Sequence, residues 1–357
     1  MDALYQSIPN YEIVFLRVTH DCQTKSRFKL MDSWIIKLHD FIGEIPFLVI
    51  SLITAVTFCF WLIPYTTDLM VSCAAGLAGD YLGREQRTLV INSSTNNPEL
   101  LLMLVSLGLG RLGGIATPLG SNFANIYLMF IVAPLFVLVK WFFKRDFNNI
   151  LSLLTLMNSE KKLVVWHSIM SLTMFGFASV AYWCLTGGFQ FNYLSEDIPL
   201  RTWHWLLIGV FICIIGIGIF VYFENNLKTK RPGLFEDITE EDFESSWWKF
   251  ILGTISLTVL CYILNALFLA YTELYSSVLS QWLGSAVFVG LHYFIGSLIS
   301  SLPEANVAIK NYERLTSPDL NTALASASQS NMTNLALGCL GCIIATILLL
   351  TGLSYKL

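Results

Sequence analysis

The chain has 357 residues, of which 55% are hydrophobic and only 13% are charged. A single soluble core cannot bury so many apolar runs, so the composition predicts an integral membrane protein. The net charge of −4, with basic residues spread over short loops, argues against a nucleic-acid partner. No polar segment is long enough to form a separate catalytic domain, so we expect no enzyme.

Residues 1–42 are expected to form a polar N-terminal arm, which lacks the short apolar core of a signal peptide. Within it, apolar residues recur at helical spacing and predict an amphipathic helix between Arg27 and Asp40. These residues are Phe28, Met31, Trp34, Ile35 and Leu38. Such a helix suits either the membrane interface or a capping position on the protein itself.

Eight apolar segments follow and predict an all-α, polytopic membrane protein. Five lie in a first half, residues 43–224, and three in a second half, residues 248–357. The expected helices are residues 43–64, 88–110, 113–143, 163–186 and 203–223, then 248–271, 283–312 and 320–353.

Three other segments connect these helices. Residues 68–87 are less apolar and are expected to form a bent or interfacial helix, and residues 144–162 a polar loop. An acidic loop, residues 225–247, separates the two halves. We expect it to be solvated rather than a cation sensor, because it lacks the alternating acids and the glycine of a calcium-binding loop.

Two of the apolar segments contain a proline followed by a glutamate. These pairs are Pro98-Glu99, within Ser94–Glu99, and Pro303-Glu304, within Ser300–Glu304. Proline interrupts the hydrogen-bond ladder of a helix and frees nearby carbonyl groups. A glutamate at membrane depth is costly and by default marks a functional site. Neither glutamate has a lysine or arginine nearby in the sequence, which favours an ion site.

Each Pro-Glu pair is followed, about twenty residues later, by a helix rich in small and amide side chains. The first signature runs from Gly120 to Asn125 and the second from Gln329 to Asn334. Lys and Arg are concentrated in the loops after the first, third, fifth and seventh expected helices, which places these loops on the cytosolic side. The two copies then enter the membrane from opposite sides. This pattern predicts an inverted repeat with an ion site between its copies.

These residues resemble the alpha repeats of the cation/calcium exchanger superfamily, typified by sodium/calcium exchangers. Thr95, Pro98 and Glu99 match the first copy of that motif, and Ser300–Glu304 match the second. The small-residue signatures match the helix that follows each copy. The resemblance covers about residues 44–140 and 250–352. Two copies with this spacing make it specific, whereas either copy alone is weak.

The resemblance implies a cation antiporter that exchanges calcium, or a related cation, for sodium or protons by alternating access. No cofactor is expected, and the partners are the lipid bilayer and the transported ions. The first and sixth helices would slide over a core of the second, third, seventh and eighth. The implied ion ligands are Thr95, Asn96, Glu99, Ser121, Asn125, Ser300, Ser301, Glu304, Ser330 and Asn334.

The sequence departs from the family pattern in three places. Asn334 occupies a position where calcium-selective members commonly have an acid, Asn92–Ser94 alter the approach to the first motif, and the second half has three helices where the family usually has five. Two alternatives therefore stay open. One is a proton/cation exchanger; the other is a non-transporting, exchanger-like subunit or scaffold with membrane partners along its shortened second half. His167 and His292 are interpreted as packing residues in preference to a proton relay. The expected location is a plasma or organellar membrane.

Overall fold

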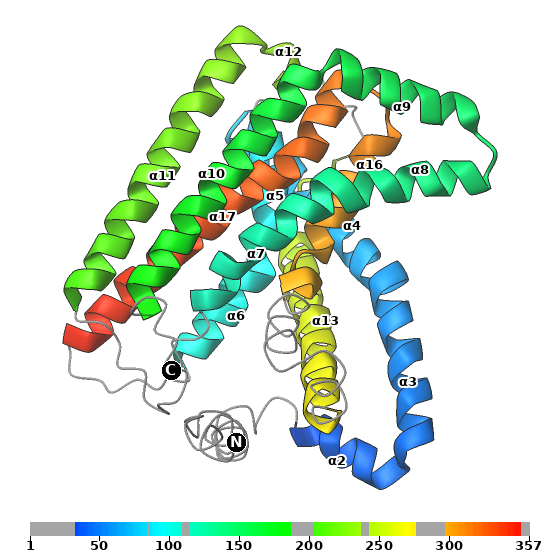
Figure 1. Ribbon diagram of the computed structural model, residues 1–357, viewed down its shortest axis with the longest axis vertical. Helices are drawn as coiled ribbons and strands as arrows, with labels where there is room; N and C mark the ends of the chain where they lie inside the picture. The colour runs from blue at the N-terminus through cyan, green and yellow to red at the C-terminus, as the bar shows by residue number, and fades with distance from the viewer. Residues whose placement is uncertain are drawn as a thin grey trace, which may run out of the picture.

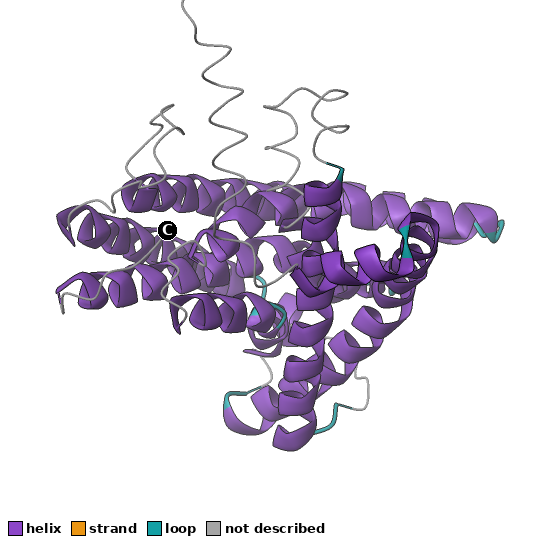
Figure 2. Ribbon diagram, turned by 90° about the horizontal axis from the view of Figure 1, so that it is seen from below, coloured by secondary structure: helices purple, strands orange, loops and turns teal. Residues whose placement is uncertain are grey.

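The computed structural model describes residues 33–83, 86–108, 115–186, 203–236, 243–275 and 297–350. All regular structure in these ranges is helical (Figure 2). Six helical stretches there are long and apolar enough to cross a membrane. They are Glu44–Tyr81, Thr117–Phe143, Lys161–Cys184, His204–Lys230, Trp247–Phe268 and Ser317–Leu348. The chain is therefore an all-α protein with the candidate spans of an integral membrane protein.

The two expected helices that contain a Pro-Glu pair are not among these six. Residues 88–110 are divided into two shorter helices, α5 (Arg87–Ser94) and α6 (Asn97–Gly108). Of the expected helix 283–312, the part before residue 297 lies outside the described residues, and α16 (Leu302–Glu313) forms its end. Eight membrane crossings therefore stay a prediction.

The first candidate span is longer than the sequence predicts. It consists of α3 (Glu44–Thr57), the π-helical turn η1 (Phe58–Leu62) and α4 (Ile63–Tyr81). The sequence predicts a bent or interfacial helix over residues 68–87. These residues are helical as far as Tyr81, as a continuation of the first span, but most of this part is buried or half-buried in the protein and does not lie at an interface. The small and polar residues of α4 are buried against neighbouring helices. Because they do not face lipid, this part of the helix can be less apolar than a lipid-exposed segment.

A glycine separates this span from the N-terminal amphipathic helix. Gly43 has a φ angle of 83°, a conformation that favours glycine, and it ends α2 (Ser33–Ile42). Residues 1–32 lie outside the described part of the chain. Ile35 of α2 and Phe47 of α3 pack against α13 (Trp247–Leu274). The described part of the arm therefore packs on the protein through its apolar residues.

The remaining helices agree with the expected segments, with two corrections. Their bounds are α7 (Ala116–Tyr127), η4 (Leu128–Val132), α8 (Ala133–Phe143), α9 (Phe147–Ser159), α10 (Lys161–Thr186), α11 (Trp203–Lys230), α12 (Gly233–Glu236) and α17 (Ser317–Leu350). The segment 144–162 is not a loop, since it contains α9, which is capped by Asp146. The start of the acidic segment is also helical, because α11 extends to Lys230 and α12 follows.

The helices are arranged in two packed groups. Figure 1 shows α10, α11 and α17 side by side, and they share one apolar cluster with α6 and α7. Gly338 and Gly341 allow α17 to approach closely: a Cβ at Gly338 would lie 2.4 Å from Leu119 of α7. In the second group α4 packs against α13, where a Cβ at Gly253 would lie 3.1 Å from Met70. The segments around the two Pro-Glu pairs lie between these groups.

Candidate functional site

The two Pro-Glu pairs occupy equivalent places at the start of a helix. Pro98 is the second residue of α6, and Pro303 is the second residue of α16. Because proline has no N–H, the carbonyls four residues earlier, those of Ser94 and Ile299, lose their helical partner. Each glutamate then lies in the first turn of its helix, where the positive end of the helix dipole favours a carboxylate.

Glu99 and Glu304 come together inside the protein. Their residues are 0% and 1% exposed, and their carboxylates lie close enough to repel one another. None of the four carboxylate oxygens has a hydrogen-bond partner among the described residues. Two buried carboxylates without donors are strongly unfavourable unless a cation or protons accompany them.

A hydroxyl from the opposite repeat approaches each glutamate. Thr95 lies beside Glu304, and Ser300 lies beside Glu99. Each hydroxyl also lies near a backbone carbonyl: Thr95 Oγ1 is 2.8 Å from that of Asn92, and Ser300 Oγ is 3.0 Å from that of Ser297. The single proton of each hydroxyl therefore has two neighbouring acceptors, the carbonyl and the carboxylate. A cluster of carboxylate and hydroxyl oxygens is the kind of ligand set that a hard cation prefers.

The helices that carry the small-residue signatures also cross between the repeats. Ser121 of α7 lies 2.9 Å from Ser300, the two hydroxyl oxygens sharing a hydrogen bond. Asn96, between α5 and α6, donates from Nδ2 to Ser330 of α17 at 3.2 Å. Each signature helix thus contacts the Pro-Glu segment of the other repeat, so the predicted ligands are brought together between the two copies.

Several predicted ligands keep a buried polar atom without a partner among the described residues. These atoms are Asn96 Oδ1, Asn125 Oδ1, Ser301 Oγ, and both Oδ1 and Nδ2 of Asn334. Asn125 uses its Nδ2 to bind Asn331 Oδ1 at 3.1 Å, which leaves its own oxygen free. All ten predicted ligands are buried. The role of Asn125 and Asn334 as ligands stays a prediction.

Sequence reasoning missed a buried chain of polar groups that leads to this site. Glu224 of α11 is 4% exposed and accepts a hydrogen bond from Gln329 Nε2 at 2.7 Å. Gln329 Oε1 in turn accepts from Asn92 Nδ2 at 2.8 Å, and the Asn92 carbonyl accepts from Asn96. Glu224 is the last residue of the expected first half and directly precedes the expected solvated loop, so its position in the sequence does not indicate burial. Asn92 precedes Asn96 by four residues, and this spacing is the signal that could have revealed it.

Contacts from α4 and α13 also reach the Pro-Glu segments. Asn97 Nδ2 donates to Thr254 Oγ1 of α13 at 3.3 Å and lies 3.8 Å from Met70 Sδ of α4. Cys261 of α13 lies within electrostatic range of both glutamates. Asp68 of α4 accepts from Asn306 and forms an ion pair with Lys310, both on α16. The α4–α13 group therefore forms one wall of the site.

The histidines of the sequence fall in different places. His167 of α10 is buried, with Nδ1 2.7 Å from Ser328 Oγ and Nε2 3.0 Å from Asn321 Oδ1. The Asn321 amide donates to the Leu234 carbonyl, which turns its oxygen toward His167. These bonds fit the expected packing role. His292 lies outside the described residues.

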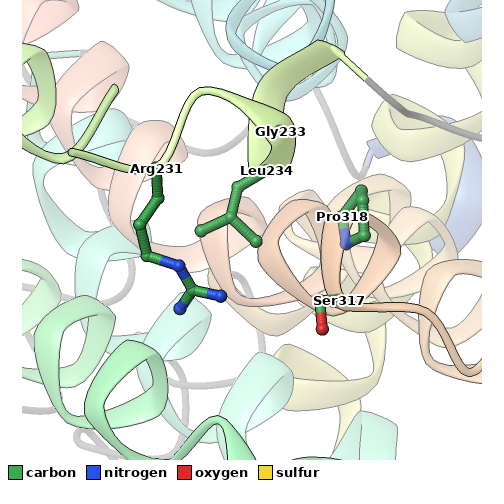
Figure 3. A pocket seen from close by; sticks show the side chains of 5 residues that line it. All are labelled: Arg231, Gly233, Leu234, Ser317 and Pro318. Atoms are coloured by element: carbon green, nitrogen blue, oxygen red, sulfur yellow. The ribbon is translucent and has the colours of Figure 1, made fainter. Parts of the chain in front are cut away.

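A pocket of about 290 Å³ lies away from the glutamates, at the start of α17 (Figure 3). Arg231 lines it together with Ser317 and Pro318. Arg231 donates two hydrogen bonds to Glu160, at 2.7 and 2.9 Å, and this pairing holds the pKa of the Glu160 carboxyl below its usual value. Because Arg231 is already paired, this pocket offers no free charge to a ligand.

Comparison with protein-family models, with curated proteins and with solved structures finds no match to this chain. The relation to exchangers therefore rests on the resemblance of the two motifs. What the described residues establish is a helical protein with six candidate membrane spans and a buried pair of glutamates, one from each Pro-Glu segment.

Proposed function

We propose that this protein is a cation antiporter, exchanging calcium or a related cation for sodium or protons across a membrane. The observation that carries the proposal is the pair Glu99 and Glu304, buried together with no hydrogen-bond donor among the described residues. Two carboxylates neutralise either one divalent cation or two monovalent ones. Competition of the two kinds of ion for one site is sufficient to couple their movements.

The surrounding oxygens supply the neutral ligands that a dehydrated cation requires. Thr95 and Ser300 supply hydroxyl oxygens beside the carboxylates, and the proline-freed carbonyls of Ser94 and Ile299 add acceptors. Asn96 and Ser301 each hold a buried oxygen without a partner in the described part of the chain. Such a donor set favours hard cations such as calcium and sodium over soft ones.

Access would alternate by movement of the α4–α13 group against the rest. This group packs around an apolar cluster that also includes Ile299 and Leu302 of the second Pro-Glu segment. It makes polar contacts to these segments at Asn97 and at the Asp68–Lys310 pair. Polar contacts of this kind can exchange partners, whereas the interdigitated cluster of α10, α11 and α17 resists sliding.

The decisive experiment measures flux of radioactive calcium into proteoliposomes of the purified chain, with sodium and proton gradients imposed separately. We expect uptake under at least one gradient, and we expect Glu99→Gln with Glu304→Gln to abolish it without loss of folded protein. Glu244→Gln, which neutralises an exposed carboxylate, is the matched control and should leave uptake unchanged. Absence of flux under every gradient, together with stoichiometric copurification of other membrane proteins, would favour the scaffold alternative instead.

A further inference from the structure

The short helix α9 has three distinct faces. Ile150, Leu153 and Met157 pack inward against the protein. Phe147, Leu151 and Leu154, spaced four and three residues apart, form an exposed apolar stripe, with 59%, 66% and 49% of each residue accessible. A third face is polar and exposed; it consists of Asn148, Ser152, Thr155 and Ser159. The apolar stripe ends at Asn158, which is exposed on the same side in the last turn of α9.

This order of faces fits a helix lying in the plane of a membrane interface. At 100° per residue, the apolar stripe falls between the packed face and the polar face, so one side meets protein, the next lipid and the last water. Figure 1 shows α9 running across the direction of the candidate span α10, at the end of that span. Figure 1 also shows α9 folding back beside α8, the end of another candidate span. The crosswise direction relative to α10 is the one that a helix in the plane of the interface takes.

Basic side chains bracket α9 at both ends. Lys144 and Arg145 directly precede it, and Lys161 and Lys162 directly follow it; all four are exposed. None of them forms an ion pair with an acid in the described ranges. The neighbouring acids are otherwise engaged, since Asp146 caps α9 through Asn149 and Glu160 is bound by Arg231.

The turn that presents this arrangement is well ordered by hydrogen bonds. Arg145 adopts a φ of 58°, and its N–H donates to the Phe142 carbonyl at 3.0 Å. The N–H of Asp146 donates to the Trp141 carbonyl at 2.9 Å. These bonds close the end of α8 in a left-handed turn, so the basic pair before α9 is held in place relative to the apolar stripe.

We propose that α9 is an interfacial helix that binds anionic phospholipid headgroups at its two basic pairs, with its apolar stripe among the acyl chains. Each pair lies at one end of α9, about 20 Å from the other, so each would attract its own headgroup. Lysine and arginine at a membrane surface attract anionic lipid through their charge. An anionic phospholipid carries both features in one molecule, since its headgroup can bind a basic pair while its acyl chains cover the apolar stripe. A protein partner would need acidic residues opposite both ends of α9 and an apolar groove between them.

The test is lipid competition on the intact, purified protein, measured by native mass spectrometry with equimolar phosphatidylglycerol and phosphatidylcholine. We expect a preference for phosphatidylglycerol that weakens with added salt. Replacing Lys144, Arg145, Lys161 and Lys162 by Gln should reduce the preference by at least about fivefold. The charge-preserving variant Lys144→Arg with Lys161→Arg and Lys162→Arg should retain it. Elution volume and circular dichroism check that each variant is folded.

Two outcomes would overturn the proposal. One is an unchanged phosphatidylglycerol preference in the folded Gln variant. The other concerns the variant in which Leu151 and Leu154 are replaced by Gln. If this variant keeps the phosphatidylglycerol preference but loses a membrane protein that copurifies with the wild type, the stripe binds a protein partner.

Discussion

Glu99 and Glu304 lie within repelling range of one another, and neither carboxylate accepts a hydrogen bond from a described residue. Their proximity joins residues that are about two hundred positions apart in the sequence. Thr95 and Ser300, which hold matching places in the two repeats, lie beside them in a crossed arrangement. Two buried carboxylates placed together are unfavourable unless a cation or protons accompany them.

The repulsion predicts a gain in stability when one charge is removed. Without added cations, Glu304→Gln should raise Tm by on the order of 2–4 °C, because about 1 kcal/mol of unfavourable buried charge is relieved. Calcium should then raise the Tm of the variant less than that of the wild type, because stabilisation by a ligand rises with the logarithm of the ligand concentration over Kd, and the variant, which has lost one charged ligand, has the higher Kd. A thermal-shift assay with and without calcium checks both effects; a variant with lower Tm and an undiminished calcium response would contradict them.

A third carboxylate should strengthen cation binding. Asn334 is fully buried, and its side chain has no partner among the described residues. Asn334→Asp adds a negative charge that offsets more of the desolvation of a bound ion, so we expect tighter binding of calcium or sodium by calorimetry. Asn225→Asp, at an exposed position of α11, is the matched control. If both affinities are unchanged in Asn334→Asp, this residue is not a ligand and the alignment of α17 with the family motif is wrong.

The buried chain from Glu224 should matter for stability. Glu224→Ala removes the acceptor for Gln329 and leaves Lys228, 3.5 Å from the carboxylate, without its acid. An unsatisfied buried donor costs about 1–3 kcal/mol, so a fall in Tm of several degrees is expected. Glu224→Gln, which can still accept from Gln329, should lose less. Equal Tm values for the wild type and both variants would show that the chain has no stabilising role.

The Glu160–Arg231 pair gives a pH-dependent contribution. Because Arg231 lowers the pKa of Glu160 in the folded protein, the pair stabilises fully above the ordinary carboxyl pKa of about 4.3 and loses this effect as the pH falls through the lowered pKa. The difference in Tm between the wild type and Glu160→Gln should therefore be largest near neutral pH and should shrink below about pH 4. A difference that is independent of pH would mean that another interaction of Glu160 is responsible.

The sequence by itself determined the class of this protein and most of its helices. Uninterrupted apolar runs leave a helix as the main option in lipid, because every backbone group must find its partner within the segment. For this reason the spans beginning near residues 117, 161, 204, 247 and 317 were predictable. The Pro-Glu breaks were equally visible, since a missing N–H interrupts a helix wherever it occurs. The inverted orientation of the repeats stays a prediction.

Other features depended on tertiary packing. The segment after residue 68 is less apolar than a lipid-exposed helix. It nevertheless continues the first span, because it packs against α13 and does not face lipid. The helix α9 was hidden because only one face of a short segment packs on the protein, leaving a mixed composition. Glu224 and Gln329, more than one hundred residues apart, met only once α11 and α17 packed together. Local sequence fixes which backbone groups can pair, whereas the partners of buried polar side chains are set by contacts distant in the chain.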